Sequence, residues 1–137
     1  MKLYHFTDTR NLASIKRYGL LSWYRLTLRK IPHIPASNEL SRELDDRKRL
    51  NNYVRVCLQD WHPMAIKAQS QNRVENLAWL MIDDSVLRWR NTLYSNKNAT
   101  SNDAVINNDK NTALKSDNPQ AEILISNALA IKWITFP

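Results

Sequence analysis

A mixed α+β domain is the fold class that the sequence predicts. Short apolar segments are interleaved irregularly with amphipathic segments, whereas an α/β fold would alternate strands and helices regularly. The 137 residues suit one domain, and no internal repeat or second apolar core divides the chain. We therefore expect a single domain over residues 1–137, with roughly six strands and three or four short helices.

The first half of the chain predicts two strands and two helices. Lys2–Phe6 has the composition of a strand, and Thr9–Tyr18 that of a helix that is capped by Thr7 or Asp8 and ends at Gly19. Residues 20–36 lack a clean period and contain two prolines, which predicts a loop. Residues 37–49 have helix-forming composition. Residues 52–58 alternate two unlike faces, as a strand does.

The second half begins with a predicted helix from Pro63 to about Gln71, because proline fits the first helical turn. Leu77–Ile82 is almost wholly apolar and predicts a central strand, and residues 83–89 predict one or two helical turns. Residues 96–118 contain seven asparagines and little apolar content, so we expect a mobile loop there. Residues 121–125 and 130–136 predict two further strands, joined by a turn at residues 126–127.

The charge of the chain indicates a polyanionic partner. The formal net charge is +7, and phosphate neutralisation with counterion release would supply affinity that does not depend on sequence. Two basic groups flank the proline-containing segment 31–35, namely Arg17, Arg25, Arg29 and Lys30 before it and Arg42, Arg47, Lys48, Arg49 and Arg55 after it. Trp23 and Tyr24 lie among the first group, as expected where bases stack. Solvated helix faces with core aromatics are the alternative interpretation.

Other classes of protein fit the sequence poorly. No apolar run approaches the ~20 residues that cross a bilayer, and the N-terminus lacks the apolar centre of a signal peptide, so we expect a cytoplasmic protein. The single cysteine, Cys57, lies in a predicted strand and is expected in the core. No Cys/His cluster has the spacing of metal ligands, so no metal is expected.

Polar residues at two distant strands predict a cleft. Tyr4-His5-Phe6-Thr7 delivers a histidine from the first strand, and Glu122 opens the strand that continues as Ile123-Leu124-Ile125. From the residues alone, His5 could also be a core histidine whose hydrogen bonds are all made within the protein, and Glu122 could be an exposed residue at the start of a strand.

Four segments, in order, resemble the ADP-ribosyltransferase toxins of the DarT type, which modify nucleobases in single-stranded DNA. They are Tyr4-His5-Phe6-Thr7 with Asn11-Leu12, Tyr53-Val54 followed by Pro63-Met64, Tyr94-Ser95 with Asn98-Ala99, and Ala121-Glu122-Ile123-Leu124. The resemblance runs through nearly the whole chain. It implies the ADP-ribosyltransferase fold, in which two small packed β-sheets, flanked by short helices, enclose an NAD cleft.

The resemblance also implies the chemistry and its residues. NAD would be the co-substrate, nicotinamide would be released, and ADP-ribose would pass to a nucleobase. Glu122 would stabilise the oxocarbenium-like sugar, and Arg42, with Arg47 as the reserve, would meet the pyrophosphate or assist transfer. His5 and Thr7 would fix NAD. The other residues matched near the cofactor are Asn11, Tyr53 and Met64, although Asn11 could be only a helix cap and the other two could be core residues.

The acceptor side follows from the same resemblance. Gln120, two residues before Glu122, would help to orient a base, because an amide presents both a donor and an acceptor. Trp23, Tyr24 and Arg47 would contact the nucleic acid, and residues 100–115 would form the recognition loop. A toxin of this type implies an antitoxin or immunity partner, either a hydrolase that removes the mark or a protein that covers the cleft.

Two interpretations from other classes stay open. The first is a related transferase that acts on RNA or protein in phage defence or conflict. The second is a non-catalytic, basic nucleic-acid-binding module, which would bind DNA and would neither bind nor consume NAD.

Overall fold

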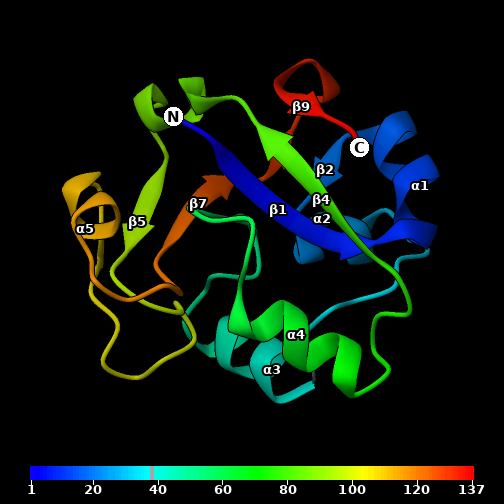
Figure 1. Ribbon diagram of the computed structural model, residues 1–137, viewed down its shortest axis with the longest axis horizontal. Helices are drawn as coiled ribbons and strands as arrows, with labels where there is room; N and C mark the ends of the chain where they lie inside the picture. Colours follow the sequence, from blue (N-terminus) through cyan, green and yellow to red (C-terminus); the bar gives the residue numbers. More distant parts are fainter. Residues whose placement is uncertain (38) are drawn as a thin grey trace.

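The computed structural model describes residues 1–37 and 39–137, and a seven-stranded sheet forms its centre (Figure 1). In spatial order its strands are β6 (Ile106–Asn107), β5 (Leu93–Ser95), β7 (Glu122–Ser126), β3 (Tyr53–Cys57), β1 (Leu3–Asp8), β4 (Leu77–Ile82) and β9 (Ile134–Thr135). Neighbouring strands in this sheet are antiparallel. A second, smaller sheet pairs β2 (Leu20–Leu21) with β8 (Ala128–Leu129). The predicted α+β class is confirmed.

Short helices connect the strands and flank the sheet. They are the 3-10 turns η1 (Thr9–Asn11), η2 (Asp84–Arg88) and η3 (Ile131–Trp133) and the α-helices α1 (Leu12–Tyr18), α2 (Trp23–Leu28), α3 (Glu39–Arg47), α4 (Pro63–Ser70) and α5 (Asn111–Leu114). In the view of Figure 1, α3 and α4 lie below β1, and α1 lies beyond β2 on the right. None of the helices in the described part of the chain has the length and apolar character to cross a membrane.

Side chains at the helix ends explain where these short helices begin. The carboxylate of Asp8, one of the two predicted caps, accepts a hydrogen bond from the backbone N–H of Arg10 (2.8 Å). The Ser22 hydroxyl caps α2 in the same way by accepting from the N–H of Arg25 (3.2 Å). Nδ1 of His62 accepts from the N–H of Met64 (3.0 Å) and caps α4, whose first residue is a proline as predicted.

The C-terminal end of α1 requires its glycine. Gly19 has φ +82° and ψ −178°, a conformation open almost only to glycine. A Cβ atom at this position would lie 2.8 Å from the carbonyl oxygen of Leu129, in the facing strand β8. The close approach of the two backbones thus fixes where α1 ends and the small sheet begins.

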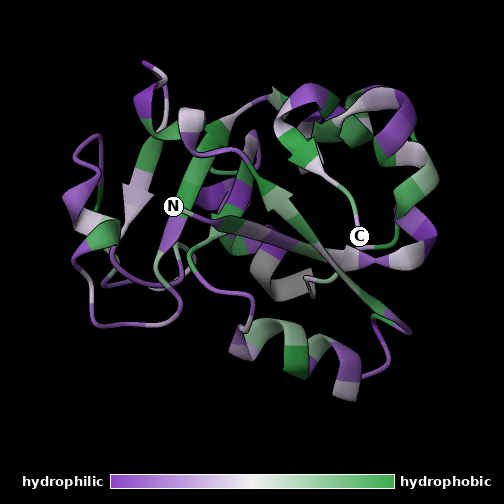
Figure 2. Cartoon of the chain, turned by 45° about the horizontal axis from the view of Figure 1, so that its top comes forward, coloured by the Kyte–Doolittle hydropathy of each residue, from purple (hydrophilic) through white to green (hydrophobic). Residues whose placement is uncertain are grey.

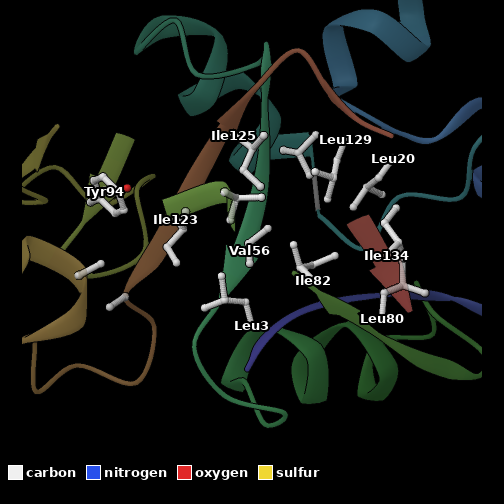
Figure 3. Close-up of a cluster of buried hydrophobic side chains, with 14 of the residues drawn as sticks. Leu3, Leu20, Val56, Leu80, Ile82, Tyr94, Ile123, Ile125, Leu129 and Ile134 are labelled. Atoms are coloured by element: carbon white, nitrogen blue, oxygen red, sulfur yellow. The ribbon is translucent and has the colours of Figure 1, made fainter. Parts of the chain in front are cut away.

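A large hydrophobic cluster packs against the main sheet (Figure 3), and a smaller one contains Leu50, Ala99 and Leu124. Leu3, Leu80 and Ile123 from three different strands are completely buried and pack in the same cluster. Cys57 is also buried, as expected, and its thiol donates to the carbonyl oxygen of Tyr4 (3.2 Å). Burial raises the pKa of the Cys57 thiol to about 12, so this cysteine is not a nucleophile at neutral pH.

Several predicted elements were correct to within a few residues. The strand predicted over 77–82 is β4, and those predicted over 2–6, 52–58 and 121–125 are β1, β3 and β7. Helices appear as predicted after Thr9 and Pro63, and the helix predicted over 37–49 appears as α3. Asn38, which that prediction included, lies outside the described residues.

Three predictions from the sequence were wrong. The segment 20–36 contains β2 and α2, because Ser22 starts a helix well before the first proline. Residues 130–136 form η3 and only the two-residue β9. The asparagine-rich segment 96–118, hydrophilic in the part of Figure 2 around α5, is not a structureless loop. It contains β6 and α5, because Asn and Asp side chains cap its turns and because Ala99 and Ala113 are completely buried.

Candidate functional site

A cleft opens where the main sheet divides. β1 is paired with β4 along its whole length, but it meets β3 at one register position, Tyr4 opposite Cys57. Beyond this one paired position the two strands separate. Both then line the same cavity, β1 with residues 5–7 and β3 with residues 53–57. The sheet thus consists of two half-sheets, β6-β5-β7-β3 and β1-β4-β9, with the cleft between them.

Glu122 lies at the floor of this cleft as the first residue of β7. Its register partners are Cys57 in β3 and Ser95 in β5, so strands hold its backbone on both sides. The residue is only 6% exposed, and Oε2 accepts hydrogen bonds from Nη1 of Arg55 (3.0 Å) and from the N–H of Ala99 (3.0 Å). Oε1 has no hydrogen-bond partner among the described residues, which leaves one carboxylate oxygen for a ligand.

His5 projects into the cleft from β1 in a defined tautomer. The carbonyl oxygen of Arg55 can only accept, so Nδ1 of His5 must carry the proton of their 2.6 Å hydrogen bond. Burial lowers the pKa of His5, although this hydrogen bond acts in the opposite direction, and the ring is therefore neutral at pH 7. Nε2 is left as a hydrogen-bond acceptor.

Arg55 is a functional candidate that the sequence analysis did not single out. Its guanidinium lies between two carboxylates, because Nη2 donates to Oδ1 of Asp45 in α3 while Nη1 donates to Glu122. Burial opposes the charge of Arg55, but the two carboxylates outweigh that effect and raise its pKa. Burial also raises the pKa of Asp45, against the influence of Arg55. In the sequence Arg55 was counted only with the basic residues that follow segment 31–35, and it lay in the middle of a predicted strand, on the same face as Tyr53 and Cys57.

Arg42, Trp23 and His33 form a second group at the cleft. The guanidinium of Arg42 lies 5.1 Å from the centre of the Trp23 ring, and Nη1 donates to the carbonyl oxygen of Ser37 (2.6 Å). The rings of Trp23 and His33 meet edge to face, with their centres 6.5 Å apart. Burial, and to a lesser degree the charge of His5, lowers the pKa of His33 to about 4. His33 was not identified from the sequence, where it appeared only as part of the proline-containing segment.

Asn11 supports the cleft from outside the cavity that Thr7 lines. Asn11 is almost completely buried and does not line the cavity. Its amide accepts from the N–H of Ile34 (2.9 Å) and donates to the carbonyl oxygen of Ile34 (2.8 Å) and to the hydroxyl of Thr7 (3.1 Å). It thereby anchors the segment 31–37, which contributes His33 and Ser37 to the cleft.

The structure brings seven of the eleven predicted site residues to one cleft. They are His5, Thr7, Trp23, Arg42, Tyr53, Met64 and Glu122. The other four, Asn11, Tyr24, Arg47 and Gln120, are not among the described residues that line it. Tyr24 is 43% exposed on α2, Arg47 is exposed at the end of α3, and Gln120 is half-buried in the turn before β7. Their roles stay predictions.

The comparison with protein families gives one match that spans most of the chain. The model described as "DarT: ssDNA thymidine ADP-ribosyltransferase, DarT" matches residues 4–124, and it confirms the resemblance seen in the sequence. A comparison with curated proteins returns no match.

Solved structures support the same fold. Thermosipho africanus DarTG in complex with ADP-ribose aligns with a TM-score of 0.80 and 19% identity, over 98% of this chain and 42% of that chain. Thermus sp. 2.9 DarT in complex with ADP-ribosylated ssDNA gives 0.75 and 18%, over 97% and 78%. The same Thermus protein with NAD+ gives 0.67 and 18%, again over 97% and 78%. The predicted ADP-ribosyltransferase-like fold is confirmed, and this chain spans less than half the length of the Thermosipho chain.

Proposed function

The chain belongs to the DarT family of ADP-ribosyltransferases, and we propose that it transfers ADP-ribose from NAD to a thymidine base in single-stranded DNA. The observation that carries this proposal is the meeting of His5 and Glu122 in one cleft, from strands more than a hundred residues apart in the sequence. Both lie inside the matched segment 4–124. The Thermus relative was solved with NAD+ and with ADP-ribosylated ssDNA, which supports the same co-substrate and acceptor here.

The cleft residues suit the binding of NAD. Nε2 of the neutral His5 would accept a hydrogen bond from a ribose hydroxyl, and the backbone near Thr7 would align the same sugar. Arg42 would pair with the pyrophosphate through its two-pronged guanidinium, which Trp23 and Ser37 already hold at the cleft. Tyr53 and Met64 would pack near the nicotinamide.

Glu122 would then serve the chemical step. The bond between the ribose C1 atom and the nicotinamide nitrogen breaks, its electron pair leaves with nicotinamide, and positive charge develops on the sugar. The carboxylate of Glu122 would stabilise that charge through Oε1, the oxygen without a protein partner. The ring nitrogen of the base that carries a proton then forms the new bond to C1, and Glu122 would take up the proton.

The acceptor strand would follow the basic and aromatic side chains around the cleft. Trp23 offers a stacking surface there, while Tyr24 and Arg47 would contact the strand outside the cavity. The amide of Gln120 would contact a base edge. Residues 100–115 would form the recognition loop. Lys48, which follows the last residue of α3, holds the start of this region by donating to the carbonyl oxygens of Ala99 (2.8 Å) and Ser101.

The cellular role follows from the chemistry. Because NAD is a cytoplasmic metabolite, the protein would act in the cytoplasm as a toxin or defence effector. Modification of bases in its own host's DNA would be harmful, so a neutralising partner is expected. This antitoxin would either remove the ADP-ribose or cover the cleft.

The proposal is tested by incubating the wild-type protein and Glu122→Gln with labelled NAD. Single-stranded DNA, duplex DNA, RNA and a protein lysate are offered separately, and each product is analysed by mass. A gain of one ADP-ribose on single-stranded DNA, lost in Glu122→Gln, is the expected result. Transfer to RNA alone, or to protein alone, would mean that the proposed acceptor is wrong. If the protein neither transferred ADP-ribose nor bound NAD, a basic nucleic-acid-binding module would be the better interpretation.

A further inference from the structure

Arg55 connects the two residues that the proposed reaction needs most. Its backbone carbonyl fixes the ring of His5 through the 2.6 Å hydrogen bond from Nδ1, and its side chain holds Oε2 of Glu122 at 3.0 Å. His5 belongs to one half-sheet and Glu122 to the other, so Arg55 links functional groups across the division of the sheet.

The ion pairs of Arg55 are poorly explained by stability alone. The side chains of Arg55, Asp45 and Glu122 are 22%, 20% and 9% exposed, and placing three charges there costs much of their hydration. In addition, Nε of Arg55 is buried and has no hydrogen-bond partner among the described residues. A buried donor without a partner destabilises the folded state, but Nε of Arg25 and Nη2 of Arg73 are in the same position, so the argument for a role other than folding rests on the three clustered charges.

The geometry does explain an orienting role. A single hydrogen bond from the N–H of Ala99 would restrain the Glu122 carboxylate only loosely. Nη1 of Arg55 adds a second contact to Oε2, and the bond from Nη2 to Asp45 prevents the guanidinium itself from turning. Oε1 is consequently the Glu122 oxygen that has no hydrogen-bond partner among the described residues, and it stays available to a ligand.

We propose that Arg55 is a positioning residue that fixes the carboxylate of Glu122 for ADP-ribose transfer, and that Asp45 holds Arg55 in place. The proposal rests on the proposed function. Neither Arg55 nor Asp45 needs to touch NAD or DNA for this role. Their loss would leave binding largely intact and would slow the chemical step.

Steady-state transfer to a thymidine-containing single-stranded oligonucleotide tests this role, together with direct titration of NAD binding. Arg55→Met keeps the aliphatic stem and removes both donors, and we expect kcat to fall about 100-fold, a loss that a misplacement of about 1 Å can cause. The Kd for NAD should change less than about threefold. Arg55→Lys can hold only one carboxylate at a time and should recover part of kcat, about tenfold above Arg55→Met. Asp45→Asn should also lower kcat, as Arg55→Met does.

Arg10→Met is the matched control. Arg10 also pairs with a buried carboxylate, Asp8 (2.9 Å), but neither residue lines the cleft. This variant should lose stability and keep kcat within about threefold of the wild type.

An Arg55→Met protein that folds and transfers ADP-ribose at the wild-type kcat would overturn the proposal. Equal losses of kcat in both variants would overturn it as well, since they would indicate a general effect on folding. Should Arg55→Met not fold, a wild-type kcat in Arg55→Lys and Asp45→Asn would decide against the proposal. A wild-type protein without transfer activity would instead contradict the proposed function.

Discussion

Replacement of Asn11 by alanine tests whether a buried amide holds the segment 31–37 over the cleft. Asn11 makes three hydrogen bonds, two to the backbone of Ile34 and one to the hydroxyl of Thr7. In Asn11→Ala the N–H and carbonyl of Ile34 lose their partner, and so does the buried Thr7 hydroxyl. Each buried polar group left unpaired costs about 1–3 kcal/mol, but Ile34 is half-buried and water can replace part of its loss.

We therefore expect Asn11→Ala to lower the free energy of unfolding by about 2–4 kcal/mol. For a chain of this size that corresponds to a Tm lower by roughly 6–12 °C. The Kd for NAD should also rise, by about tenfold, because ordering the released segment again on binding costs free energy. Urea unfolding followed by tryptophan fluorescence measures the first effect, and calorimetric titration with NAD measures the second.

Asn11→Asp is an informative companion variant. The carboxylate still accepts from the N–H of Ile34, but it cannot donate to the carbonyl oxygen of Ile34 or to Thr7. It should therefore be at least as unstable as Asn11→Ala. The reasoning would be refuted by an Asn11→Ala protein within about 0.5 kcal/mol of the wild type, because three hydrogen bonds of a buried amide cannot be lost at so small a cost.

Three further predictions concern the backbone at Gly19, the titration of His62 and the binding of single-stranded DNA. Gly19→Ala should lower the free energy of unfolding by about 2–4 kcal/mol, because the new Cβ would lie 2.8 Å from the carbonyl oxygen of Leu129 and the backbone has a positive φ; an unchanged urea midpoint would contradict this. Burial lowers the pKa of His62 from 6.5 to about 4, so on acidification the unfolded state binds the proton before the folded state does. The free energy of unfolding should therefore be at its full value above pH 6.5 and should fall towards pH 4, by on the order of 3 kcal/mol. His62→Asn keeps an acceptor for the cap of α4 and should remove the His62 share of this pH dependence, while His33 and His5, whose pKa values burial also lowers, keep theirs. Urea unfolding between pH 4 and pH 8 would measure the difference. Binding to single-stranded DNA should weaken with salt, with a log–log slope of about −0.7 per phosphate contact, and a flat response would favour a protein acceptor.

Sequence patterns predicted the central elements because those elements carry strong local signals. The apolar run of β4 has no competing interpretation, and Pro63 marks the start of α4. His5 and Glu122 were found because they belong to short segments that the family shares. Strand periodicity alone does not predict that the two residues lie in one cleft, because this depends on the tertiary structure.

The missed features have physical reasons. Arg55 resembled a solvent-facing strand residue, because its partners Asp45 and Glu122 lie in elements that only the tertiary structure brings together. In residues 96–118 the composition predicted mobility, but order there comes from Asx-type turns and from two buried alanines, which carry almost no hydrophobic signal. The helix α2 was missed because the prolines at 32 and 35 dominated the interpretation of its surroundings.

The single bridge between Tyr4 and Cys57 has a mechanical consequence. The half-sheets share a hydrophobic core cluster, whose contacts are non-directional, and among the described residues this bridge is their one point of strand pairing. A small rotation about the bridge would widen or narrow the cleft without breaking a ladder of backbone hydrogen bonds. We therefore expect any relative movement of the half-sheets to turn about this bridge, and a ligand that contacts His5 on one side and Glu122 on the other would hold them together by its own binding energy.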